Sequence, residues 1–112
     1  MTKISFLENI HFDATPQITK MLETPNSKDI RICMKKGNAM KEHTAPAAIT
    51  IMVLQGEVII DSSGNTIVLH NGEMVYFDAK VPHSLAAVQD SIIRLTLSKN
   101  DTVQRVQNLV KL

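Results

Sequence analysis

The feature that most constrains this chain is a regular alternation of short β-rich runs with turn-forming residues. From Lys36 to Asn100, turn signals recur about every eight to twelve residues, a spacing typical of antiparallel sandwiches and barrels. The apolar runs between the turns follow one another without the helical segments that a parallel βαβ sheet requires. We therefore expect an all-β fold made of antiparallel strands.

The runs that predict strands are rich in Val, Ile, Leu and Thr and end at Gly, Asn, Asp or Ser. They cover residues 30–34, 49–54, 58–60, 66–69, 74–77 and 93–97, with a weaker candidate at 18–22. The turn residues between 58–60 and 66–69 predict a hairpin, in which Gly64 and Asn65 tolerate positive φ.

The end of the chain has a different period. Val103, Val106, Leu109 and Val110 recur at helical spacing behind Asp101 and Thr102, either of which is a suitable N-cap. This pattern predicts a short amphipathic helix at about 101–111.

The run at 49–54 is apolar on both faces. Ile49, Ile51 and Val53 share one face of a strand, while Met52 and Leu54 lie on the other. A strand of this kind is covered on both sides, so one face should line the interior and the other should pack on a second sheet or a partner chain. We expect a homodimer.

Length, charge and cysteine content exclude several classes of protein. A chain of 112 residues has room for one domain, and its net charge of +1 lacks the concentrated positive patch of a nucleic-acid binder. The single cysteine, Cys33, cannot form an internal disulfide and reads as a small buried hydrophobe. With no signal peptide and no long apolar span, we expect a cytoplasmic protein that does not contact membranes.

Two glycines each precede a histidine. Gly37 is followed after five residues by His43, and Gly72 is followed after ten residues by His83, which Pro82 immediately precedes. A third glycine, Gly56, closes the apolar strand, and fifteen residues separate it from Gly72.

This arrangement resembles the two motifs of the cupin superfamily. The match spans about residues 30–98, and both motifs occur at the right separation on a strand-rich background. The resemblance implies a single cupin domain over residues 1–112, folded as an antiparallel jelly-roll barrel with an interior pocket and a short C-terminal helix.

Several positions depart from the family pattern. The position of the second motif histidine is Ala45, and that of the metal-binding glutamate is Ile49. In the second motif, Asp78, Lys80 and Ala87 stand where the family has proline, glycine and asparagine. Only His43 and His83 remain of the four metal ligands that the resemblance implies.

Three functions are compatible with these residues. The first is a small-molecule binding protein whose pocket includes His43, His83, Ile49 and Ile51, with or without a divalent cation (Zn, Ni, Fe or Mn) held by the two histidines. The second is a metal-dependent enzyme, a dioxygenase or an isomerase, with a non-standard ligand set. The third is an interaction protein with a vestigial pocket. The sequence does not decide whether the protein is an enzyme.

Overall fold

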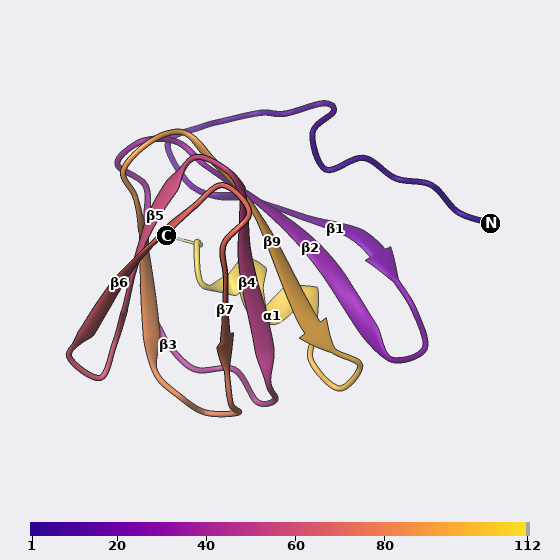
Figure 1. The fold of residues 1–112 in the computed structure, drawn as a ribbon. Helices are drawn as coiled ribbons and strands as arrows, with labels where there is room; N and C mark the ends of the chain where they lie inside the picture. The colour runs from indigo at the N-terminus through magenta and orange to yellow at the C-terminus, as the bar shows by residue number, and fades with distance from the viewer. Residues whose placement is uncertain (112) are drawn as a thin grey trace.

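The computed structural model describes residues 1–111, which form nine strands and one helix (Figure 1). In chain order the elements are β1 (Gln17–Glu23), β2 (Ser27–Met34), β3 (Ala39–His43), β4 (Ile49–Gln55), β5 (Glu57–Ser62), β6 (Asn65–His70), β7 (Met74–Phe77), β8 (His83–Ala87), β9 (Ser91–Ser98) and α1 (Val103–Asn108).

The strands form two antiparallel sheets that face each other. One has the order β1-β2-β9-β4-β7 and the other the order β3-β8-β5-β6. Most neighbours in each sheet are distant in sequence: β9 pairs with β2 and β4, and β8 pairs with β3 and β5. This interleaved pairing is that of a jelly roll, so the predicted all-β barrel with a C-terminal helix is confirmed.

Strand β4 has the alternation that the sequence predicts. Ile49, Ile51 and Val53 are buried between the sheets, whereas Met52 and Leu54 on the outer face are only half-buried. The inward residues pack in one hydrophobic core with those of β2 and β9, including Ile32, Ile93, Leu95 and Leu97. That shared core joins the two sheets.

The predicted hairpin is formed by β5 and β6, and its turn lies within the predicted stretch between residues 60 and 66. Ser62 pairs with Asn65, which leaves Ser63 and Gly64 as the two turn residues. Both have positive φ (52° and 83°), the requirement of a two-residue turn that matches the twist of the strands. Asn65, which the sequence offered as a second residue that tolerates positive φ, belongs instead to strand β6.

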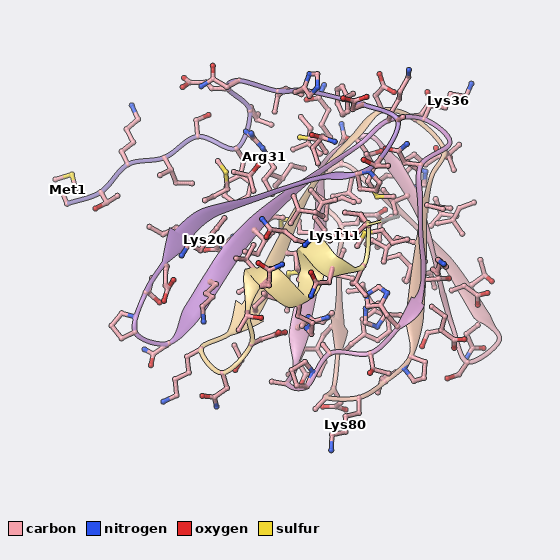
Figure 2. The ribbon with its side chains drawn as sticks, turned by 180° about the vertical axis from the view of Figure 1, so that it is seen from behind. Met1, Lys20, Arg31, Lys36, Lys80 and Lys111 are labelled. Carbon is pink, nitrogen blue, oxygen red and sulfur yellow. The ribbon has the colours of Figure 1, made fainter. Side chains whose placement is uncertain are left out.

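Helix α1 lies between the two sheets and covers the open end of the barrel (Figures 1 and 2). The Thr102 side chain accepts a hydrogen bond from the Arg105 amide, so Thr102 is the N-cap, and Val106 is buried in the core. The helix spans Val103–Asn108 and is therefore shorter than the predicted range of about 101–111. Among residues 1–111, no helix has the length and apolar character needed to span a membrane.

Gly56 connects β4 to β5 in a backbone conformation that other residues rarely adopt. Its φ is +114°, and a Cβ added there would overlap the Ser91 hydroxyl and come within 2.7 Å of the Asp90 carbonyl oxygen. Its amide donates to the Asn71 side chain, so the turn is held from two sides. By contrast, Gly64 also has positive φ, but nothing lies within 4 Å of an added Cβ.

We predict that Gly56→Ala destabilises the protein much more than Gly64→Ala. At Gly64 the cost is only that of a left-handed residue, about 1–2 kcal/mol, whereas at Gly56 overlap with the β9 backbone adds about 1–3 kcal/mol. Urea unfolding of both variants measures the difference. Equal losses would show that the contact with Ser91 does not constrain this turn.

Candidate functional site

The two histidines lie opposite each other on paired strands of one sheet. His43 ends β3, His83 begins β8, and the two residues are direct partners in the antiparallel register. Their rings meet edge to face with centroids 4.4 Å apart. The register of β3 shifts between Met40 and His43. Residues three apart would lie on opposite faces of a regular strand, but because of this shift the side chains of Met40 and His43 both point inward.

Phe77, a residue that the sequence analysis did not single out, fixes the position of the His83 ring. The two rings stack with centroids 4.6 Å apart and an interplanar angle of 16°. Phe77 ends β7, which brings it opposite Ile49 of β4. His83 itself is 1% exposed and lies at the centre of the site.

Backbone hydrogen bonds set the same tautomer in both rings. His43 Nδ1 lies 2.7 Å from the Lys41 carbonyl oxygen, and His83 Nδ1 lies 2.9 Å from that of Val81. Because a carbonyl oxygen only accepts, each Nδ1 carries a proton and donates it. In the neutral rings, Nε2 is therefore the nitrogen with a lone pair available to a ligand.

Both imidazoles are less basic than ordinary histidines. Burial lowers the pKa of His43 below 6.5, the hydrogen bond to Lys41 opposes this effect, and the positive charge of Arg105 adds to the lowering. Burial likewise lowers the pKa of His83, where His43 and Arg105 act in the same direction. At neutral pH the site therefore holds two uncharged rings.

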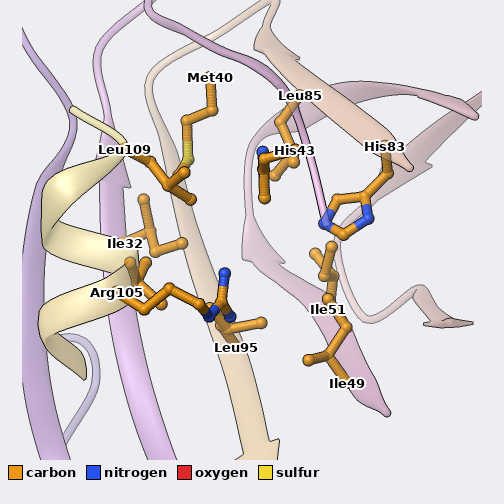
Figure 3. Close-up of a pocket in the computed structure, with 11 residues that line it drawn as sticks. Ile32, Met40, His43, Ile49, Ile51, His83, Leu85, Leu95, Arg105 and Leu109 are labelled. Carbon is orange, nitrogen blue, oxygen red and sulfur yellow. The ribbon is translucent and has the colours of Figure 1, made fainter. Parts of the chain in front are cut away.

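The rings face a small cavity, here called the histidine chamber. It is enclosed by β2, β3, β4, β8, β9 and the α1 segment, and its lining residues are Ile32, Met40, His43, Ile49, Ile51, His83, Leu85, Leu95, Arg105, Val106 and Leu109 (Figure 3). The structure thus brings all four sequence-predicted site residues, His43, His83, Ile49 and Ile51, to one cavity. The cavity volume is about 10 Å³, which is room for about one water molecule.

Arg105 is a charged chamber residue that sequence reasoning missed. Its guanidinium reaches from α1 towards the strands of the chamber (Figure 3) and is paired with Asp101 through two hydrogen bonds of 2.7 Å. The spacing of Asp101 and Arg105 is a helix signal. Nothing in that spacing indicates that the helix folds back over the barrel.

Other polar residues near the two motifs lie outside the chamber. Glu42 and Ser84 alternate with the two histidines and face a separate groove on the outer side of the sheet. Asp78 accepts a hydrogen bond from the Tyr76 hydroxyl at an exposed position. His70 is exposed between Glu57 and Glu73. None of them supplies a third ligand beside His43 and His83.

The donor set of the chamber does not fit a tightly held divalent metal. Residues 1–111 contain no group of three or more His, Cys, Asp or Glu side chains placed to hold an ion. Ala45 and Ile49, at the positions of the lost ligands, are buried and offer no donor atom, and Arg105 adds a positive charge to the lining. Catalytic zinc sites have three protein ligands, and non-haem iron sites have two histidines plus a carboxylate.

Solved structures of similar fold come from several bacteria. An RmlC-like cupin from Desulfovibrio desulfuricans is 24% identical, with a TM-score of 0.78 over 88% of this chain and 96% of the other. A conserved protein of unknown function, SPY1581 from Streptococcus pyogenes, is 17% identical, with a TM-score of 0.75 over 88% and 87%. An uncharacterised double-stranded β-helix protein from Klebsiella pneumoniae is 19% identical, with a TM-score of 0.74 over 88% and 89%.

These likenesses show the fold and no particular activity. A search of curated proteins finds no match. The family model of the cupin domain matches residues 30–98, which include both histidines, most of β2, strands β3 to β9 and all of the chamber except the α1 segment. This chain belongs to the cupin family.

Proposed function

We propose that this cupin binds a small organic molecule in the histidine chamber. The observation that carries the proposal is the pair of neutral imidazoles, each anchored through Nδ1 and presenting Nε2 within a lining that is apolar apart from Arg105. A few fixed polar groups on apolar walls are typical of small-molecule sites, where they orient the ligand. The activity of this cupin, beyond binding, is undetermined.

The donor inventory supports binding over metal-dependent catalysis. A dioxygenase or isomerase needs a metal with open coordination positions, and the chamber offers two imidazoles and a guanidinium instead. It also supports binding over a vestigial pocket. The hydrogen bonds of the described chain engage only Nδ1 of each ring and leave both Nε2 atoms for a ligand in the shared cavity.

We predict that fragments binding this protein shift the methyl resonances of Ile49 and Ile51 in NMR spectra. The double variant His43→Gln/His83→Gln should weaken this binding by about tenfold or more, because both orienting groups change. The matched control is His11→Gln/His70→Gln, which alters two exposed histidines and should bind as the wild type does.

Metal analysis of the freshly purified protein discriminates the enzyme alternative. We expect well below one Zn, Ni, Fe or Mn per chain, in a protein that is fully folded. One equivalent of any of these metals, lost in the His83→Gln variant, would contradict the proposal and favour a metalloenzyme.

The lowered histidine pKa values predict a specific pH dependence of stability. The unfolded chain binds more protons than the folded one once pH drops below 6.5, so the free energy of unfolding decreases from there down to the folded-state pKa values. His83→Gln should reduce this decrease, as measured by urea unfolding between about pH 7.5 and about pH 5.5. Carboxyls with lowered pKa values titrate below 4.5, outside this window. An identical pH profile in the variant would refute the assignment.

The expected homodimer and cytoplasmic location stay predictions. For the dimer, we propose the outer face of β4 and β7, where Met74 and Tyr76 are more than half exposed beside Met52 and Thr50. Strand β7 is a sheet edge, and the same patch on two copies is self-complementary about a two-fold axis.

We predict a dimer by light scattering at micromolar concentration. Tyr76→Glu should give a monomer, because the carboxylates of the two copies would be buried next to each other at the two-fold axis without a positive partner. Val68→Glu, at an exposed position of β6, is the control and should stay dimeric. A monomeric wild type would rule out this interface.

A further inference from the structure

Helix α1 seals the histidine chamber on one side. Arg105, Val106 and Leu109 line the cavity from this segment, and Val106 is 1% exposed. The helix has six residues, and a helix of that length is not stable by itself in water. Its position therefore depends on the apolar contacts and hydrogen bonds that it makes with the barrel.

The base of the helix is more firmly attached than its end. Lys28 of β2 donates to the carbonyl oxygens of Lys99 and Asp101, each at 2.8 Å, and the Asp101 amide donates to Ser98. Beyond Arg105, the described segment is held to the barrel by apolar contacts alone, those of Val106 in the core and of the partly buried Leu109 and Val110. This arrangement is that of a flap whose attachment lies at residues 99–101.

Arg105 is positioned for a task other than pairing with Asp101. Besides the two bonds to that carboxylate, its Nη1 donates to the Thr44 carbonyl oxygen at 3.3 Å, immediately after His43. These three bonds use three of the five N–H groups of a guanidinium, so two remain for a ligand. The carboxylate holds the guanidinium in place at the wall of the chamber.

The charges of the lining favour an anion. Within the described chain, Arg105 is the one charged side chain that faces the chamber, the two imidazoles are neutral, and the remaining lining residues are apolar. A planar guanidinium with free N–H groups matches a carboxylate, and the aliphatic walls match a short hydrocarbon body.

The chamber, as the structure has it, is too small for such a molecule. Its volume of about 10 Å³ takes about one water molecule, so an organic ligand enters only if part of the wall moves. The other walls are hydrogen-bonded strands, whereas α1 is short and attached at one end.

We infer that α1 is a lid that opens to admit a small organic anion, and that Arg105, carried on this lid, selects a carboxylate. The inference rests on the proposed function and adds the class of ligand and the route of entry. Closing the lid over the ligand brings the guanidinium to the carboxylate, while His43 and His83 contact the other side.

The test compares two probes of the same shape, isobutyrate and isobutyramide, by NMR titration at neutral pH. We expect isobutyrate to bind the wild type about tenfold more tightly than the amide, because charge-assisted hydrogen bonds are stronger than neutral ones. The double variant Asp101→Asn/Arg105→Gln should bind both probes equally. It removes both partners of the ion pair, so no unpaired buried charge is left to unfold the protein.

The matched control is Asp29→Asn/Arg94→Gln, which removes another Arg–Asp pair from the outer face of the sheet. It should keep the preference for the carboxylate. Equal binding of both probes to the wild type, with shifts at Ile49 and Ile51, would overturn the inference but leave the proposed function standing. Failure of both probes to shift those residues would count against both.

Amide hydrogen exchange tests the lid itself. We expect the Val106 and Gln107 amides to exchange at least about a hundredfold faster than those of Ile93 and Leu95, by local opening, and to slow when isobutyrate is bound. Exchange of α1 only together with β9 would mean that the helix opens only when the whole barrel unfolds, and the lid would be excluded.

Discussion

The rest of this structure depends on the pairing of β9 with two strands that are far from it in sequence. Residues 91–98 hydrogen-bond to β2 on one side and to β4 on the other, and they place Ile93, Leu95 and Leu97 in the core. The order of this sheet follows from that pairing. Because α1 follows β9 after a short turn, the direction of β9 also decides where Arg105 lies. The architecture and the chamber thus share one constraint.

The chemistry of the chamber follows from what has replaced the ligands of the family pattern. Ala45 and Ile49 are buried apolar residues at positions where a metal site needs donors, and burial there lowers the pKa of both remaining histidines. Among the described residues that line the chamber, Arg105 on α1 is the one with a charged side chain. These substitutions form a consistent set, because a site without carboxylates suits an anionic or neutral ligand better than a cation.

Much of the fold could be predicted from local patterns, and the errors have local causes. Residues 74–77 form the strand β7 as expected, because alternation and turn residues act over a few positions. The turn stretch predicted from the sequence is wider than the observed turn, since Ser63, Gly64 and Asn65 are all acceptable turn formers and only the register of β5 with β6 chooses among them. The irregularity between Met40 and His43 has no sequence signal, since pairing with β8 produces it.

By itself, the sequence determined the strands, the family and the two histidines, because periodicity and motif spacing are properties of neighbouring residues. Only the tertiary structure decided what surrounds those histidines. Phe77 stacks on His83 because β7 pairs with β4, and Arg105 reaches the chamber because α1 folds back over the barrel. Both contacts join segments with no common pattern in the sequence. They arise because the apolar faces of these segments are buried against each other. The hydrophobic effect is not directional, so it brings surfaces together without specifying which polar side chains become neighbours.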